Sequence, residues 1–531
     1  MRLRKLPNND NLERFQKFLL LLASLFILST VPAYWIQVPD SGWYLTSAET
    51  LLAEYRYWFN GAPNLHYYPG FSSILIPPLV LFGKNFFALQ FYVAFIALLG
   101  VWGLRKYYSV NTYGYTALFL PILLITSSIF TEYMYVLYSD CTFLALTIFA
   151  LLSWRKYLET YQVSYLAICF LLVSISSLVR FQGLFLCAAF SVALLMHAWS
   201  LRKRVDIVKM ACLLTLCGLV FLPFGIWTIR NYLLYTPDTF NMANSRFFGL
   251  SGLALYAEGF PGGTSLAGIS EGGYIPIQRA ALFFGGLLEF WYGGITLTNK
   301  KIILPLILLL FAFGVKPWLK RANYLEFFYV LFSLAYIGNS IFFKNNLHIV
   351  LRYWIPILPF FVMIMGLGIQ SILNWKLLAF TKPVSQAFTV LFVITLLVIS
   401  HPNLTKHIGL EERRGEESRA LAAVKVFTDI NIPINAVVAT TEWGIMPSTI
   451  DRRSFPVLND PDHKETIARM LKYQTEFLIT YGKFSRRDVH ALNLVTKHSD
   501  VFTKVFGVNE GVPNLAIMVY KINLNKLENI L

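Results

Sequence analysis

Two aspartates stand at the boundaries between apolar and polar sequence. Asp40 follows the first apolar run, in VPDSGWYLTSAETLL (38–52), and Asp140 begins a later one, in YSDCTFLALTIFALL (138–152). A carboxylate at a helix start can cap free amide groups, and it can also remove a proton from an attacking hydroxyl. The two uses are compatible, so both aspartates are candidate catalytic residues.

Other side chains at similar boundaries could bind a charged or sugar-like ligand. Arginine can bind phosphate through two hydrogen bonds and stays charged. An arginine side chain near a membrane also extends to lipid headgroups. Tyrosine rings stack on sugars or lie in the aromatic belt of a membrane protein, and a histidine near a membrane end is commonly a hydrogen-bonded interface residue. The candidate binding residues are Arg352, Arg230, Arg180, His348, Glu132, His66, Tyr68 and Tyr353.

The composition is typical of a membrane protein. The chain of 531 residues is 56% hydrophobic and only 14% charged, whereas soluble domains are about 25% charged. Apolar runs predict about eleven transmembrane helices. They cover 17–36, 86–106, 113–130, 136–153, 163–181, 183–199, 207–229, 302–318, 325–343, 354–373 and 384–401.

Three further segments are predicted to lie at the membrane surface or partly within it. Residues 71–83 and 281–294 are apolar but short or interrupted by Pro and Gly, which is typical of re-entrant or interfacial pieces. Residues 44–59 carry apolar side chains at helical spacing, which predicts an interfacial amphipathic helix. Six aromatic residues of the surrounding loop, 37–85, are expected at headgroup depth. They are Trp43, Tyr44, Tyr57, Trp58, Tyr67 and Tyr68.

The placement of basic residues predicts the orientation. Short loops rich in Lys and Arg, including RK at 105–106 and LRKR at 201–204, fall on one side, which is the cytoplasmic side together with the N-terminus. The loop 37–85 and residues 402–531 then lie on the opposite, periplasmic face. The chain therefore divides into a transmembrane domain (1–401) and a C-terminal soluble domain (402–531), in which strand-like runs NAVVAT, FLITY and LAIMVY alternate with helical patterns and predict an α/β fold.

Charge and cysteines narrow the possible functions. The formal net charge of +16 is the cytoplasmic loop signal spread over many loops, and no basic face with interleaved aromatics indicates nucleic-acid binding. All five cysteines fall in apolar runs, so neither a disulfide framework nor a CxxC metal site is expected. No cofactor is predicted, and a role for a divalent metal stays open.

Several motifs together resemble a known family. In order, they are DSGWYLTSAETLL (40–52), HYYPGFSSILIPPLVLFG (66–83), YSDCTFLALTIFALL, LVRFQGLFL (178–186), IWTIRNYLLYTPDTF (226–240) and LRYWIPILPFFVMIMGLGI (351–369). This set is similar to the GT-C membrane glycosyltransferases, in the bacterial branch related to protein O-mannosyltransferases and the lipid A aminoarabinose transferase. Ser41 departs from the family pattern, which has Glu there, and YYPGF replaces a common double proline.

The resemblance implies a function. A polyprenyl-phosphate-linked sugar donor would pass its hexose or pentose to a lipid, glycan or protein acceptor, usually with inversion, on the periplasmic face of a bacterial inner membrane. Asp40 would be the base and Asp140 a second active-site acid, while Arg352 with Arg230 or Arg180 would hold the donor phosphate. Membrane lipids are further expected partners.

Two other classes of protein stay open. A polytopic transporter or flippase would line a translocation path with the same charges, but the sequence has no matching pair of inverted halves. A non-catalytic subunit of envelope glycan assembly would use residues 402–531 to bind a partner, and Ser41 keeps that alternative open.

Overall fold

The structure is a computed structural model that describes 10–36, 38–59, 62–65, 67–111, 115–125, 128–201, 207–234, 297–343, 354–373, 415–442, 445–457, 463–481, 486–509 and 516–530. The predicted span 384–401, the segment 281–294 and four candidate site residues lie outside these ranges. The four are His66, His348, Arg352 and Tyr353.

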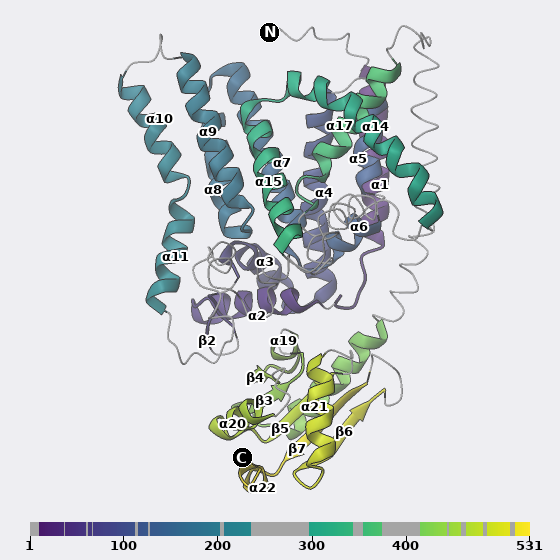
Figure 1. Ribbon diagram of the computed structural model, residues 1–531, viewed down its shortest axis with the longest axis vertical. Helices are drawn as coiled ribbons and strands as arrows, with labels where there is room; N and C mark the ends of the chain where they lie inside the picture. The colour runs from purple at the N-terminus through teal and green to yellow at the C-terminus, as the bar shows by residue number, and fades with distance from the viewer. Residues whose placement is uncertain are drawn as a thin grey trace, which may run out of the picture.

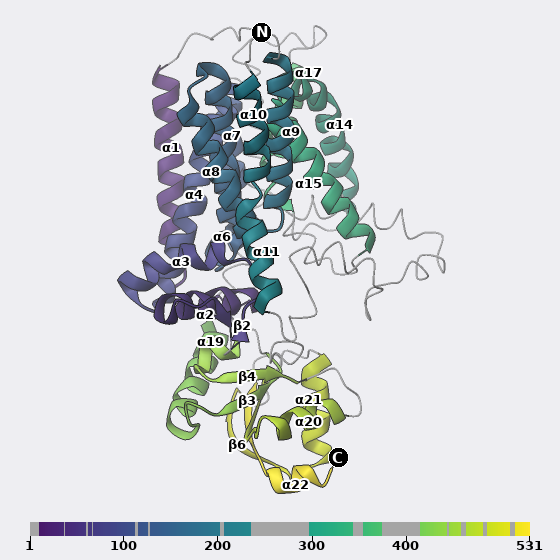
Figure 2. The same ribbon diagram turned by 90° about the vertical axis from the view of Figure 1, so that its left-hand side faces the viewer.

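Most predicted spans correspond to helices that run side by side (Figures 1 and 2). Three of the described helices are long and apolar enough to cross a membrane, and a bent pair could make a fourth. The count of about eleven spans therefore stays a prediction. The bundle comprises α1 (Asp10–Ser29), α4 (Phe86–Asn111), α5 (Tyr115–Ile125), α6 (Ser128–Tyr135), α7 (Ser139–Thr160), α8 (Val163–Val179), α9 (Gly183–Leu201), α10 (Ile207–Leu219), α11 (Leu222–Leu234), α14 (Leu297–Arg321), α15 (Tyr324–Phe343) and α17 (Leu358–Leu373).

Two predicted spans are each divided between two helices. The run 113–130 contains all of α5 and the start of α6. The run 207–229 is divided into α10 and α11, which meet at a bend of 41°. Pro223 is the second residue of α11, and proline is tolerated in a first helical turn but cannot continue a preceding helix. The bend therefore follows from the sequence.

The first loop contains two helices that lie across one end of the bundle (Figure 1). They are α2 (Pro39–Glu54) and α3 (Pro69–Phe82), and a small hairpin of β1 (Trp58–Phe59) and β2 (Ala62–Pro63) lies between them. The helix predicted over 44–59 was wrong in both bounds. The observed helix α2 begins earlier, because Pro39 suits the first helical position. It ends at Glu54, because Tyr55 adopts the left-handed conformation with φ of 55°.

Three aromatic residues of this loop face the protein interior, whereas Tyr55 is exposed. Trp43, Tyr44 and Tyr57 are each at most 6% exposed, so these rings contact protein, and their position at headgroup depth stays a prediction. Trp43 stacks on Phe59 with ring centroids 3.7 Å apart. The apolar spacing of α2 thus corresponds, over the first part of the helix, to side chains that are buried in the protein.

The C-terminal segment forms a five-stranded sheet with helices beside it. The strand order is β4-β3-β5-β7-β6. Strand β3 pairs in parallel with β4 and β5, and β7 pairs antiparallel with β5 and β6. The predicted strand runs become β3 (Val437–Thr440), β5 (Phe477–Tyr481) and β7 (Ile517–Ile522). The remaining elements are the helix at 415–431, α19 (Met446–Ile450), β4 (Arg453–Pro456), α20 (Lys464–Lys472), α21 (Arg486–Lys497), β6 (Phe502–Val508) and α22 (Leu524–Glu528).

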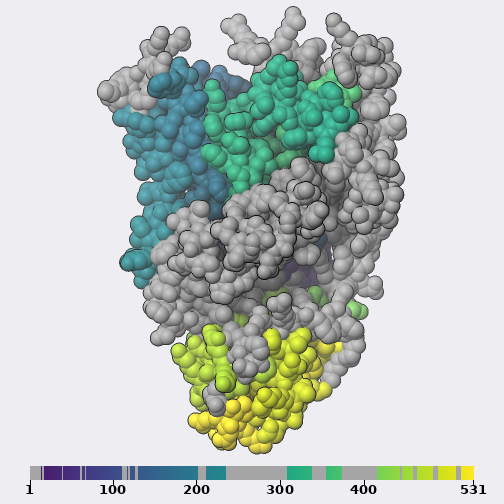
Figure 3. Space-filling model, viewed as in Figure 1, coloured from purple at the N-terminus to yellow at the C-terminus, as the bar shows by residue number. Residues whose placement is uncertain are grey.

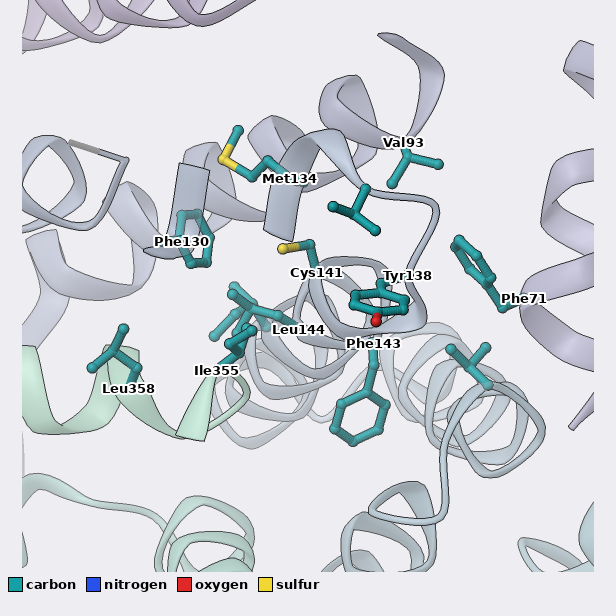
Figure 4. Close-up of a cluster of buried hydrophobic side chains, with 14 of the residues drawn as sticks. Phe71, Val93, Phe130, Met134, Tyr138, Cys141, Phe143, Leu144, Ile355 and Leu358 are labelled. Carbon is teal, nitrogen blue, oxygen red and sulfur yellow. The ribbon is translucent and has the colours of Figure 1, made fainter. Parts of the chain in front are cut away.

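This α/β unit, residues 415–530, lies beyond α2 and α3 (Figures 1 and 2) and forms the yellow and light-green end of the space-filling view (Figure 3). Its own core includes Phe455, Met470 and Leu478. A second, larger core surrounds the start of α7 in the bundle, where Phe71, Phe130, Cys141 and Ile355 converge from α3, α6, α7 and the turn before α17 (Figure 4). Candidate residues at the start of α7 are therefore enclosed by apolar side chains.

Candidate functional site

Asp40 occupies the first turn of α2, where the positive end of the helix dipole favours a carboxylate. It is not the N-cap, because that position belongs to Val38. The phenol of Tyr67 donates a hydrogen bond to Asp40 Oδ1 at 2.6 Å, and the Asp40 side chain is half-buried. The phenol helps to position the carboxylate, and the half-buried side chain is partly exposed at the surface.

Ser41 performs the capping that Asp40 was expected to supply. Its hydroxyl donates to the carbonyl of Val38 at 2.7 Å and accepts from the amide of Val38 at 3.3 Å. Ser41 is fully buried, and a short hydroxyl fits this local double bond. The departure from the family pattern therefore stabilises the start of the helix that carries Asp40.

A group of aromatic and hydroxyl residues links α2 to α7. The ring of Tyr67 meets Tyr44 edge-on at 5.0 Å between centroids, and the Tyr44 hydroxyl lies 3.2 Å from Ser139 Oγ. Ser139 immediately precedes Asp140 at the start of α7. Asp40 and Asp140 therefore lie on helix starts that are joined through Tyr44.

Asp140 has a different environment from Asp40. It is fully buried, and Arg180 Nη1 lies 2.5 Å from its Oδ1. The Nε of Arg180 donates to Gln182 at 2.5 Å. Arg180 ends α8, so this ion pair ties the start of α7 to the turn between α8 and α9.

Arg230 also binds the protein itself. Its guanidinium donates to the carbonyls of Tyr57 and Asn64 at 2.9 and 3.1 Å, and its charge lies 4.6 Å from the ring centroid of Trp227. The neighbouring Asn231 donates to Leu65 at 3.1 Å. The Arg-Asn motif in α11 therefore fixes the hairpin of the first loop against the bundle.

The two other described candidates lie at the edge of this region. Tyr68 is the N-cap of α3, its carbonyl accepts from Tyr57 at 3.0 Å, and its ring tilts against Phe224 and Trp227. Glu132 is half-buried in α6, one turn before that helix ends. The structure thus joins Asp40, Asp140, Arg180, Arg230 and Tyr68 to the first loop or to the helices beside it.

The described residues contain no cluster of three His, Cys, Asp or Glu side chains suited to a metal ion. The five cysteines are free thiols in α7, α8, α9 and α10. The polar groups described here are carboxylates, phenols and guanidinium groups, which can transfer protons and stabilise anions.

Comparison with solved structures identifies the fold, although no family model and no curated sequence matches the chain. ArnT from Cupriavidus metallidurans, bound to undecaprenyl phosphate, matches with a TM-score of 0.57 and 12% identity over 95% of this chain and 97% of that chain. The chain has the GT-C fold. The resemblance to the GT-C membrane glycosyltransferases is therefore confirmed for the fold.

Two other solved structures of glycosyltransferases with the GT-C fold are similar to this chain. The Archaeoglobus fulgidus oligosaccharyltransferase in its apo form has a TM-score of 0.51 and 12% identity over 95% of this chain and 76% of its own. The arabinofuranosyltransferase AftD from Mycobacteria has a TM-score of 0.50 and 11% identity over 96% of this chain and 41% of its own. The fold and the apolar helices together make this a membrane protein.

The hydrogen-bond partners of the candidate residues have no signal of their own in the sequence. Tyr67 is expected in the aromatic belt, and in the structure its phenol binds Asp40. Ser139 and Gln182 were not singled out, although each adjoins a motif residue and bonds to Arg180. Their positions beside Asp140 and Arg180 were the only available signal, because hydrogen bonds between distant segments have no sequence pattern.

Proposed function

We propose that the chain is an integral-membrane glycosyltransferase that transfers a hexose or pentose from a polyisoprenyl-phosphate donor to a hydroxyl acceptor, with inversion. The acceptor is a lipid, a glycan or a protein on the periplasmic face of a bacterial inner membrane. Residues 1–401 form the catalytic transmembrane domain and 402–531 a periplasmic α/β domain, with the N-terminus in the cytoplasm.

The observation that carries the proposal is the position of Asp40 within a GT-C fold. The similar ArnT structure contains undecaprenyl phosphate, which favours a lipid-phosphate donor for this chain also. Asp40 lies in the first turn of α2, half-buried, and its carboxylate accepts a hydrogen bond from the phenol of Tyr67. A half-buried carboxylate held in place in this way can act as a general base toward a bound hydroxyl.

The reaction needs one proton acceptor and one stabilised leaving group. The acceptor hydroxyl oxygen attacks the anomeric carbon opposite the phosphate, and the bond between that carbon and the phosphate oxygen breaks through an oxocarbenium-like state. Asp40 takes the hydroxyl proton. The departing polyprenyl phosphate keeps the bonding electrons, so its negative charge needs a positioned cation.

The arginines divide between these tasks and structural support. Arg180 and Arg230 are engaged with Asp140 and with loop carbonyls, so we assign them to positioning α7 and the first loop. Arg352 is the proposed phosphate contact, together with His348 and Tyr353, which are near it in the sequence. His66, Tyr68 and Glu132 are proposed to contact sugar or acceptor.

The decisive experiment is transfer of label by the purified full chain. Polyprenyl-phosphate hexoses and pentoses carrying a radiolabelled sugar are supplied with membrane extract as the source of acceptor. Asp40→Asn should lower transfer by about 100-fold or more, as expected for loss of a general base. Glu54→Gln, exposed at the other end of α2, is the matched control and should transfer normally.

Each other outcome points elsewhere. Full activity of Asp40→Asn would remove Asp40 from the mechanism. Movement of sugar or lipid across a vesicle membrane without bond cleavage would favour a transporter or flippase. Binding to an envelope glycan assembly without any transfer would favour a non-catalytic subunit.

A further inference from the structure

The short helix α19 belongs to the α/β unit, yet it is buried against α2. All five of its residues, Met446–Ile450, are buried, including the polar Ser448 and Thr449. It connects the parallel strands β3 and β4, and Figure 2 shows it directly beside α2. A buried hydroxyl must find a hydrogen-bond partner to avoid a desolvation cost, so the partners of Ser448 and Thr449 show what each residue does.

Ser448 bonds to α2, whereas Thr449 bonds within its own unit. The Ser448 hydroxyl donates to the carbonyl of Gly42 at 2.8 Å and lies 2.5 Å from the hydroxyl of Thr46. The Thr449 hydroxyl donates to the carbonyl of Ile445 at 3.1 Å. Of these two adjacent buried hydroxyls, that of Ser448 connects the α/β unit to α2 and that of Thr449 bonds within the α/β unit.

Lys84 strengthens the same contact from a third segment. It lies between α3 and α4, and its ammonium group lies 2.6 Å from the Ser448 carbonyl, 3.0 Å from Glu49 and 3.2 Å from Asp451. An ammonium group has three donors, and here each has an acceptor. Lys84 thus connects α2, the end of α3 and the α/β unit in one polar cluster.

The opposite side of α2 is bound to the membrane bundle and the first loop. Ser72 donates to the carbonyl of Tyr44 at 2.9 Å, Asn64 donates to Ser47 at 2.8 Å, and the Tyr44 phenol contacts Ser139. The helix that carries Asp40 is therefore held from two sides, by the bundle through Tyr44 and by the α/β unit through Ser448.

We infer that Ser448 and Lys84 are positioning residues, through which the α/β unit sets the position of α2 and hence of Asp40. Gly42 and Thr46 lie within two turns of Asp40 on the same helix. A shift of α2 at these residues moves the carboxylate with it, because a helix transmits displacement along its axis. The catalytic consequence rests on the proposed function, whereas the structural consequence does not.

Amide hydrogen exchange of the full chain, without substrate, tests the structural part. Ser448→Ala removes the hydroxyl that bonds α2, and it should raise exchange rates in the peptide covering Gly42–Glu54 by about tenfold, the equivalent of one buried hydrogen bond. Thr449→Val removes a hydroxyl from the same short helix and should leave that peptide unchanged. Equal exchange of α2 in wild type and Ser448→Ala would overturn the inference.

Sugar transfer tests the catalytic part. Ser448→Ala should lower kcat by about tenfold and leave KM for the donor unchanged, because a displaced base slows proton removal without weakening lipid binding. Thr449→Val should retain wild-type kcat. An unchanged kcat would contradict a positioning role. A change in KM for the donor as large as the change in kcat would contradict it as well.

A second variant covers the possibility that Ser448→Ala does not fold. Lys84→Met keeps the apolar stem and removes the ammonium group, so it should also raise exchange in α2, and slow exchange there would count against the inference. If neither wild type nor any variant transfers sugar while α2 exchange still responds, the proposed function fails and the contact between the units stands.

Discussion

The two candidate aspartates occupy equivalent helical positions and differ only in what surrounds them. Each is the second residue of its helix, in the first turn of α2 or of α7. Asp40 is half-buried beside a phenol, whereas Asp140 is fully buried against a guanidinium group. A base must be reachable by its substrate, so Asp40 suits proton transfer and Asp140 suits support of the site.

The phenol of Tyr67 gives the first prediction at this scale. Tyr67→Phe removes a hydrogen bond to a carboxylate, which is worth about 1.5–3 kcal/mol, and leaves the ring contact with Tyr44. We expect kcat for sugar transfer to fall about tenfold or more, while the far-ultraviolet circular dichroism stays unchanged. Tyr55→Phe, at a tyrosine that is 90% exposed, is the control and should behave as wild type.

The buried ion pair gives the second prediction. Asp140→Asn leaves the Arg180 charge without its carboxylate, and breaking such a pair costs about 3–5 kcal/mol. Thermal unfolding in detergent should therefore shift clearly downward. Asp140→Leu combined with Arg180→Met should recover part of the loss, since an apolar pair needs no compensation. A single Asp140→Asn variant as stable as wild type would contradict this account.

At the scale of elements, close helix packing depends on glycines that face each other. Gly314 of α14 lies against the backbone of Ile364, and Gly368 of α17 lies against that of Leu310. A Cβ at either glycine would collide with the carbonyl of the opposite helix. Small residues that let two backbones approach are typical of membrane helix pairs, so α14 and α17 form a tightly packed unit.

Gly314→Leu is the corresponding prediction. The side chain forces α14 away from α17, and overpacking of this kind costs about 1–3 kcal/mol. We expect a lower unfolding temperature in detergent. Gly218→Leu in α10 adds the same side chain where nothing lies within 4 Å of a Cβ, and it should change the unfolding temperature little. Equal destabilisation by both variants would show that close packing is not the cause.

At the scale of the whole molecule, charges help to join the α/β unit to the first loop. Burial raises the pKa of Glu49, and Lys84 opposes that effect. Burial also acts to raise the pKa of Asp451, but Lys84 and Lys425 outweigh it and hold that pKa below its ordinary value of 3.8. The two carboxylates therefore take up protons in order as the pH falls, Glu49 before Asp451.

This order predicts the response of the contact to acid. A carboxylate with a lowered pKa in the folded protein stabilises above its ordinary pKa, and it loses that contribution as pH falls through the lowered value. A carboxylate whose pKa is raised in the folded protein has the opposite effect, because its protonation favours the folded state. Protonation of Glu49 therefore does not weaken the folded state. Spin labels at the exposed Leu52 and Ile430 should keep one distance from pH 7 to about pH 5 and show a broader distribution only below about pH 4.

Asp451→Asn provides the comparison. It removes the carboxylate that lies between Lys84 and Lys425, so the label distribution should broaden already at pH 7. Glu159→Gln, in an exposed ion pair on α7, should leave the distribution unchanged because such pairs contribute little. Broadening of the wild type at pH 5 would instead assign the contact to Glu49.

The sequence by itself determined the membrane class, the approximate positions of most described helices and the strands β3, β5 and β7. It could do so because apolar runs and short alternating patterns reflect local energies of burial. The order of motifs was also sufficient to indicate the GT-C fold, and Asp40 could be selected because its boundary position and surrounding motif are both local features.

Only the tertiary structure decided what each polar residue contacts. Tyr67 binds Asp40, Arg180 binds Asp140, and Ser448 binds α2 across 406 positions of sequence. Ser41 departs from the pattern of the GT-C motif, and its hydroxyl bonds to the backbone of Val38 at the start of α2. A hydrogen bond between distant segments depends on the whole path of the chain, which brings the atoms together, and no local pattern of residues records that path.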